Sequence, residues 1–362
     1  MHYFIFSNKD ATLYSNYQSQ NTGKDEILEI YKIPYSASYS GIVSGTLLSR
    51  ALVSFDLTKV SQSIVNGTIG TDARFYLNLY VCQASHQPET TSLYIYPISQ
   101  SWRQGIGKRF DSIIREGGVS WIYRDYDANL QWASTGSAFI NNEVIAQLWD
   151  DENQFQNSGH YTYELSDLRA DVTSIVKEWL SGSYANNGFL IKRTGSQEED
   201  STDYGLLQFY STDTHTIYNP KLEVAWDDST FATGSLTQST VSDLFVYVKQ
   251  LQATYNNRDK SRFRIGSRPK YPTKSYVLAN PYNVDWYLPS SSYYSIVDSQ
   301  TEETFIPFDT SSTKLSCDSN GNYFDLWMNG FHPERYYRIK IKVVSGSFEQ
   351  VFEMPTSFRV SR

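Results

Sequence analysis

Short runs that alternate apolar and polar residues restrict the fold of this chain more than any other feature. The clearest run covers residues 73–81, where Phe75, Leu77, Leu79 and Val81 are separated by polar or tyrosine side chains. A period of two residues places one set of side chains against a core and the other toward solvent, as in a β-strand. Similar runs recur between turn-forming residues along the whole chain. We therefore predict an all-β protein built from β-sandwiches.

The composition agrees with this fold class and argues against one class of partner. Aromatic residues make up 15% of the 362 residues and charged residues only 19%, and aromatic side chains suit a pleated, half-buried surface. The net charge of −8 argues against a nucleic-acid-binding surface, which needs a basic stripe. We interpret the basic cluster at residues 258–264 as a solvated loop and predict no nucleic-acid partner.

One short helix is predicted at about residues 171–181. Val172, Ile175, Val176 and Trp179 recur there at helical spacing, which gives the segment one apolar face. A glycine at position 182 then ends the helix.

A polar segment at residues 229–240 lacks core-forming side chains and predicts a linker. It separates a first domain, residues 1–228, from a second domain, residues 241–362, whose closely spaced strands favour an immunoglobulin-like or fibronectin-like sandwich. Residues 331–339 resemble the loop and tyrosine-bearing strand of a fibronectin-like domain, whose tyrosine ties down a corner. An amphipathic edge strand is the alternative interpretation.

Four segments of the first domain form a recognisable series, at residues 43–57, 73–81, 92–102 and 171–182. In this order they resemble the DNRLRE family of β-sandwich modules, which are similar to carbohydrate-binding modules. Such modules occur on cell-surface proteins, polysaccharide-acting enzymes and phage virion proteins. The resemblance covers roughly residues 10–228 and implies a jelly-roll-like sandwich with a binding or structural role.

The chain departs from this family by an insertion at about residues 131–170. Because a long loop is costly to order without a purpose, the insertion favours contact with a partner, with Trp132 and Trp149 as candidate interface residues. Residues 298–309 and 322–330 further resemble the C-terminal part of structural proteins from tailed phages.

Catalytic motifs are not found in the sequence. It contains no G-x-S-x-G or H-E-x-x-H motif and no glycine-rich phosphate loop. Its five histidines lie in polar contexts typical of loops, and its acidic residues cluster in turns, whereas a glycosidase needs two carboxylates that face each other across a cleft. We predict that the protein is not an enzyme and requires no cofactor.

Two small sets of residues could bind ligands. Asp125, Asp127 and Asn129 offer oxygen atoms at alternate positions and are candidate calcium ligands, although the segment lacks the glycine and distal glutamate of an EF-hand. Asp-rich and Asn-rich turns also form for backbone reasons alone. Tyr126 and Trp132 are candidate platforms for a glycan, because a flat ring packs on the apolar face of a sugar.

The remaining features concern the cellular setting. Two distant cysteines exclude a disulfide scaffold, and Cys82 is predicted to be a buried free thiol. The first residues do not resemble a signal peptide, and no apolar run is long enough to cross a membrane.

Together these features favour a non-enzymatic structural component of a tailed-phage virion. We expect the protein to be made in the host cytoplasm and to lie at the neck, tail or capsid surface of the virion. Several copies would be held on the particle by contacts with one another and with other virion proteins. The alternative is a polysaccharide-binding adhesin module that recognises a host surface glycan.

Overall fold

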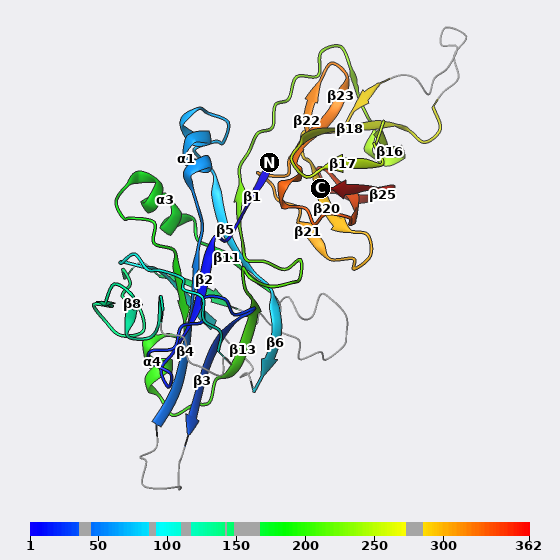
Figure 1. Cartoon of the computed structure of the whole chain (residues 1–362). Helices are drawn as coiled ribbons and strands as arrows, with labels where there is room; N and C mark the ends of the chain where they lie inside the picture. Colours follow the sequence, from blue (N-terminus) through cyan, green and yellow to red (C-terminus); the bar gives the residue numbers. More distant parts are fainter. Residues whose placement is uncertain (36–44, 87–91, 110–116, 142, 148–166, 273–284) are drawn as a thin grey trace. The chain divides into compact units, whose positions relative to one another are not determined.

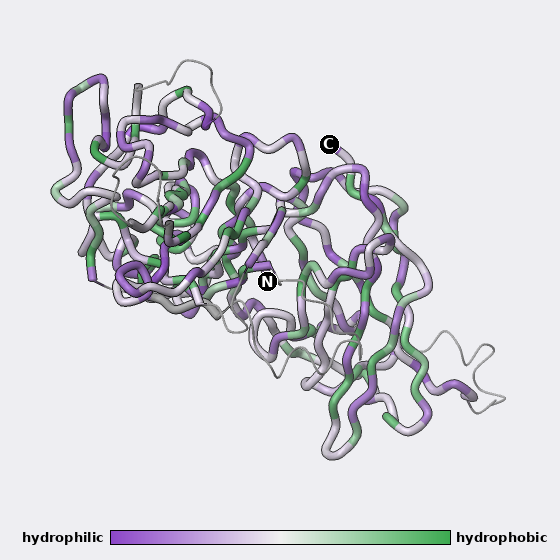
Figure 2. Tube along the Cα trace, turned by 90° about the horizontal axis from the view of Figure 1, so that it is seen from below, coloured by the Kyte–Doolittle hydropathy of each residue, from purple (hydrophilic) through white to green (hydrophobic). Residues whose placement is uncertain are grey.

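The alternating segments form mainly antiparallel sheets in the computed structural model, which confirms the all-β prediction (Figure 1). The structure describes residues 1–35, 45–86, 92–109, 117–141, 143–147, 167–272 and 285–362. The chain folds into two units. The first unit comprises residues 5–65 and 74–223, and the second comprises residues 1–4, 66–73 and 224–362. Hydrophobic and hydrophilic positions alternate along the strands (Figure 2).

The large sheet of the first unit contains eight strands, with β2 paired to β4 beside the main path. Its order is β10 (Val144–Gln147), β7 (Ser92–Pro97), β12 (Phe189–Lys192), β4 (Gly45–Ser54), β3 (Ile27–Tyr35), β13 (Gly205–Tyr210) and β6 (Val81–Ser85), and β2 covers Lys9–Tyr14. A smaller sheet follows the order β1 (His2–Phe6), β14 (Lys221–Ala225), β5 (Arg74–Leu79) and β11 (Leu168–Asp171). The hairpin β8 (Tyr123–Asp125) and β9 (Leu130–Gln131) completes the strands described for this unit.

Tryptophan side chains cover one face of the large sheet. Trp102, Trp121 and Trp132 belong to one buried cluster with apolar residues of β2, β4 and β12. The segment that carries these tryptophans therefore closes the core, so it does not form a free loop.

Among the residues that the structure describes, the first unit contains three helices where one was predicted. Helix α3 (Thr173–Ser181) confirms the prediction and ends at Gly182, which has a positive φ of 81°. The helices α1 (Thr58–Val65) and α4 (Gly195–Glu199) were missed. Helix α1 is only eight residues long and buries only Val60, so its apolar pattern is too short to stand out in the sequence. Helix α4 is only five residues long and depends on a capping box made by Thr194 and Gln197.

The second unit packs two sheets face to face. One follows β15 (Thr237–Gln238), β19 (Trp286–Tyr287), β18 (Lys260–Pro269), β23 (Gly321–Trp327) and β22 (Ser316–Asp318), with β16 (Leu244–Lys249) paired to β18. The other follows β17 (Thr254–Asn256), β25 (Phe348–Ser361), β24 (Tyr336–Ser345), β20 (Ser292–Asp298) and β21 (Thr304–Ile306). The described part of this unit also contains the short 3-10 helices η1 (Val241–Asp243) and η3 (Met328–Gly330).

Aromatic rings dominate the core of the second unit. Tyr294 stacks on Phe324 with ring centroids 4.1 Å apart, and Phe324 stacks on Phe263 at 5.2 Å. The tyrosine corner predicted from residues 331–339 is present, because the buried Tyr337 hydroxyl accepts a hydrogen bond from the His332 N–H at 2.9 Å. Strand β24 pairs with both β20 and β25, so the edge-strand alternative is wrong.

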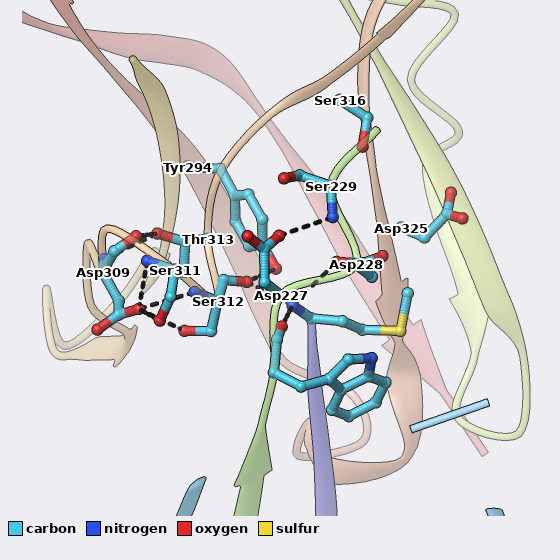
Figure 3. Close-up of polar contacts among 12 residues, drawn as sticks. Asp227, Asp228, Ser229, Tyr294, Asp309, Ser311, Ser312, Thr313, Ser316 and Asp325 are labelled. Carbon is cyan, nitrogen blue, oxygen red and sulfur yellow. Dashed lines mark hydrogen bonds and ion pairs between the residues drawn. The ribbon is translucent and has the colours of Figure 1, made fainter. Parts of the chain in front are cut away.

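The division of the chain differs from the predicted one. The α-amino group of Met1 donates to the Trp226 carbonyl at 2.6 Å and lies 3.0 Å from the Asp228 carboxylate, which holds residues 1–4 in the second unit. Beside it, the Asp309 carboxylate accepts hydrogen bonds from the backbone and hydroxyl groups of Ser311 and Ser312 (Figure 3).

The predicted linker at residues 229–240 is not a free connection. The Ala232 N–H donates to the Cys317 carbonyl at 2.9 Å, and β15 pairs with β19. This segment lacks core side chains because it is attached mainly through its backbone. The polar sequence therefore led to the prediction of a linker where the chain forms an edge strand of a sheet.

Part of the predicted insertion at residues 131–170 also belongs to the sheets. Strand β10 extends the large sheet beside β7, and β11 pairs with β5 in the small sheet. Trp149 lies outside the residues that the structure describes, so its predicted interface role stays a prediction.

Candidate functional site

The structure corrects the prediction for Trp132. Its side chain is only 5% exposed, and its indole N–H donates to the Ser120 carbonyl at 3.0 Å. A ring that is packed in the core presents no face to a sugar or to a partner protein. Tyr126 is half-buried, and its ring meets Tyr123 edge-on with centroids 4.9 Å apart. The predicted glycan-binding role of Tyr126 stays a prediction, and Trp132 cannot serve as the second platform that was expected beside it.

The candidate calcium ligands face an arginine. The Arg103 guanidinium lies 2.5 Å from an oxygen of Asp127 and 3.8 Å from an oxygen of Asp125. Asn129 occupies an exposed turn with φ of 52°, a conformation that asparagine tolerates. This cation neutralises the carboxylates that calcium would need. Among the described residues no group of three or more His, Cys, Asp or Glu side chains is placed to hold a metal ion.

Two buried carboxylates of the first unit, Glu198 and Glu29, are held in fixed ion pairs. Glu198 on α4 receives two hydrogen bonds from Arg50, at 2.9 and 2.8 Å, and a third from Lys192 at 2.7 Å. Burial lowers the pKa of Lys192, and the nearby Arg50 charge lowers it further. An arrangement with one carboxylate between two buried cations balances charge inside the fold and leaves the carboxylate engaged.

A second buried carboxylate is engaged in the same way. Glu29 on β3 accepts hydrogen bonds from the Tyr14 hydroxyl and the Gln208 amide, each at 2.6 Å, and pairs with Arg109. General acid or base chemistry needs a group that can reach a substrate proton. Glu29 is 5% exposed and serves instead to join β2, β3 and β13.

The surface best suited to function lies where β5 passes into β6. Three tyrosines meet there with Phe6, and we call these four residues the tyrosine patch: Phe6, Tyr80, Tyr210 and Tyr218. Tyr218 lies between the other two tyrosines, with ring centroids 5.3 Å from Tyr80 and 5.6 Å from Tyr210. The ammonium of Lys221 is 5.2 Å from the Tyr80 ring and 5.6 Å from the Phe6 ring. Phe6 is exposed, and the three tyrosines are half-buried.

The strand pattern explains why these rings face outward. Along β13 the residues Gly205, Leu207 and Phe209 are buried, so Tyr210 at the end of the strand points to the other face. Tyr80 separates β5, in the small sheet, from β6, in the large sheet, and its carbonyl accepts the Tyr210 N–H at 3.0 Å. The change of sheet at Tyr80 places its ring beside Tyr218.

A β-bulge at the same place exposes Cys82. Gln208 pairs with Gln83, whereas the next residue, Phe209, pairs with Val81, so Cys82 is the extra residue of β6. Its thiol is exposed, whereas Cys317 is buried. The predicted burial of Cys82 is wrong because the bulge reverses the alternation at one position. A hydrogen bond with the Cys82 side chain is the main cause that raises the pKa of Tyr210.

Strand β6 is the last strand of the large sheet as far as the structure describes it. The outer edge of such a strand presents backbone N–H and C=O groups that can pair with another chain. Tyrosine rings beside such an edge have the composition of a protein interface, where aromatic residues carry much of the binding energy. Sequence analysis missed this surface because its residues come from four separate segments. The only sign was that Tyr80 and Tyr210 alternate with core residues.

Comparisons with known proteins add little. No family model and no curated protein matches the chain, so its resemblance to the DNRLRE family stays a prediction. Among the solved structures that match, three have TM-scores of 0.17 to 0.18, which are too low to carry an argument. They are a β-glucuronidase from Parabacteroides merdae (TM-score 0.17, 7% identity, 96% of this chain and 35% of that chain), the adhesin domain of Epf from Streptococcus pyogenes (0.18, 10%, 97% and 91%) and a DUF4785 family protein from Legionella pneumophila (0.17, 11%, 100% and 64%). The chain thus spans about a third of the length of the glucuronidase. In the part of the chain that the structure describes, no helix is long and apolar enough to span a membrane.

Proposed function

We propose that this chain is a non-enzymatic structural component of a tailed-phage virion, located at the neck, tail or capsid surface. It works through protein–protein contacts with further copies of itself and with other virion proteins. The virion setting rests on the sequence resemblances alone, and the tyrosine patch beside β6 is the observation that supports a contact role.

The tyrosine patch supports this role because it combines partly exposed rings with a strand edge. Its side chains are already ordered by ring contacts, so little side-chain entropy is lost when a partner covers them. A partner that adds a strand to β6 would gain backbone hydrogen bonds, and the tyrosines would give specificity.

The engaged state of the buried carboxylates supports a non-catalytic role. Glu29 binds three side chains at short distance, and Glu198 accepts three hydrogen bonds from two side chains. Measurement of reducing ends after incubation with bacterial surface polysaccharides tests this role. Steady turnover that a single carboxylate substitution abolishes would contradict it.

The contact role is tested by incorporation into particles. Tyr218→Ser removes the central ring of the patch, and we expect it to reduce the amount of chain in purified virions by about tenfold or more, as for loss of an interface aromatic. Tyr184→Ser is the matched control, because Tyr184 is also an exposed tyrosine of the first unit and should change incorporation little. Absence of the wild-type chain from purified virions would contradict the proposal, and so would equal incorporation of both variants.

A further inference from the structure

Strand β18 in the second unit carries a basic residue at every second position of its first half. Phe263 and Ile265 point into the core. The even-numbered residues Lys260, Arg262 and Arg264 therefore lie on the opposite face of the strand. The interpretation of residues 258–264 as a solvated loop is therefore wrong for the residues from Lys260 onward. They form one face of a strand that pairs with β23 over residues 260–265 and with β16 from Arg264 onward.

Neighbouring strands fix the two guanidinium groups. Arg262 donates to both oxygens of Asp325 at 2.8 and 3.0 Å, through Nε and Nη2. Arg264 donates to both oxygens of Asp318 at 2.6 and 2.8 Å, through Nη1 and Nη2. The guanidinium carbons lie 4.0 and 5.2 Å from the centroid of the Tyr323 ring. Both groups are preorganised, and these carboxylate pairs leave Nη1 of Arg262 and Nε of Arg264 unused.

A groove of about 470 Å³ runs beside these arginines, within the range typical of small-ligand sites. Its lining contains four cationic side chains, Lys249, Lys260, Arg262 and Arg264, and one carboxylate, Asp259. The four cations also pair with Asp285, Asp325 and Asp318 outside the lining, so the groove offers fixed charged donors and no large excess of positive charge. The rest of the lining consists of amide and hydroxyl side chains, apart from the largely buried Tyr255. Gln250, Gln252, Thr254, Asn256 and Ser261 provide these polar groups.

We propose that this groove binds a short segment of an acidic glycan, such as a chain that contains uronic acids. Each sugar hydroxyl both donates and accepts a hydrogen bond, which matches the amides and hydroxyls of the lining. The Lys260 ammonium and the fixed guanidinium groups would bind the sugar carboxylate with charge-assisted hydrogen bonds. The proposal assigns a site outside the segment that resembles the DNRLRE family and does not depend on the assembly role.

The lining favours a glycan over the other anionic polymers. A protein partner binds most strongly through apolar and aromatic anchors, and the lining offers only Tyr255, which is largely buried. A nucleic acid would need exposed rings on which bases stack, whereas Tyr255 is largely buried and Arg262 and Arg264 already cover the neighbouring Tyr323 ring.

Calorimetric titration of the full chain with tetragalacturonic acid tests the proposal, with maltotetraose and hexaglutamate as neutral-sugar and acidic-peptide controls. We expect binding of tetragalacturonic acid only. Arg262→Gln and Gln252→Ala, on separate parts of the lining, should each weaken it, the first by about tenfold or more because a charge-assisted contact is lost. Arg268→Gln is the matched control, since Arg268 lies on the same strand, stacks on Phe245 and is not part of the lining.

Unchanged melting temperatures would show that the variants are folded. The proposal fails if tetragalacturonic acid does not bind at millimolar concentration, or if Arg268→Gln weakens binding as much as Arg262→Gln. Equal binding of maltotetraose would overturn the acidic assignment. Equal binding of hexaglutamate would overturn the glycan assignment.

Discussion

The two units fill the interiors of their sheets with different kinds of side chain. The first unit buries charges, and its fully buried residues include Lys32, Lys221 and Arg193. The second unit buries aromatic rings, of which Phe263, Phe324 and Tyr294 stack in one group. Several of its ion pairs lie on a sheet surface, as in Arg262 with Asp325, although the buried Asp298 pairs with Arg335. Rings tolerate loss of a single polar contact, whereas a buried charge that loses its partner is strongly unfavourable. The first unit should therefore be the more sensitive to changes of charge.

Removal of the Glu198 charge should have the largest effect. Glu198→Gln leaves Arg50 and Lys192 buried without a carboxylate, and we expect the first unit to lose about 3–5 kcal/mol of unfolding free energy. Hydrogen exchange measured by mass spectrometry reports each unit separately, and protection in the second unit should not change. Glu199→Gln, on the exposed neighbour in α4, is the control, with an expected change below about 0.5 kcal/mol. Equal effects of the two variants would contradict the inference that buried charges make the first unit sensitive to changes of charge.

The two units should also respond to pH in opposite directions. Burial raises the pKa of Asp10 in the first unit from 3.8 to about 7, although hydrogen bonds from Thr212 oppose the shift. Because the folded pKa exceeds the unfolded one, the folded state holds the proton more tightly. The resulting stability is complete below about pH 4 and is lost as the pH rises through 7, by up to about 4 kcal/mol. Asp10→Asn should flatten the stability of the first unit between pH 4 and 8 in urea titrations.

The second unit contains carboxylates with the opposite shift. The Arg264 side chain lowers the pKa of Asp318. For Asp298, burial acts to raise the pKa, but hydrogen bonds from Gln300, Thr301 and Arg335 outweigh it. Stability from these groups is present above their unfolded pKa of 3.8 and is lost as the pH falls below it. A second unit that loses protection on alkalinisation from pH 4 to 8 would contradict this assignment.

Loss of the tyrosine corner should have an intermediate effect, confined to the second unit. Tyr337→Phe keeps the buried ring and removes the acceptor of the His332 N–H, which should cost about 1–3 kcal/mol. Tyr336→Phe alters the exposed neighbouring tyrosine and should be close to neutral. The midpoint of urea unfolding, followed by tryptophan fluorescence and hydrogen exchange, measures both variants.

The smallest effect is expected at a surface ion pair of the second unit. Lys342 and Glu349 pair at 2.5 Å across β24 and β25, with the glutamate largely exposed. Glu349→Gln should change the free energy of unfolding by less than about 1 kcal/mol. A loss comparable to that of Glu198→Gln would show that charge burial does not distinguish the units.

Sequence analysis predicted the features that depend on local pattern. The alternation at residues 73–81, the helix ended by Gly182 and the corner made by Tyr337 could all be inferred, because each is encoded within a few neighbouring residues. Features that depend on distant partners were missed. Trp132 is placed in the core by Trp102 and Trp121, and the strand β15 is attached to the second unit by backbone pairing that its polar sequence does not indicate.

The candidate site was missed for the same reason. The tyrosine patch collects residues from four segments, and the exposure of Cys82 follows from a one-residue bulge opposite Gln208 and Phe209. A single extra residue reverses which side chains face outward. No periodicity within the segment indicates where such an insertion lies.

Differential alkylation of Cys82 tests the central claim, that the surface beside β6 is a contact in the assembled particle. Cys82 is exposed and belongs to this surface, whereas the buried Cys317 serves as an internal control. The account predicts that maleimide modifies Cys82 rapidly in the free chain and slowly in intact virions, while Cys317 reacts slowly in both. Equal rates for Cys82 in the free chain and in virions would contradict the account.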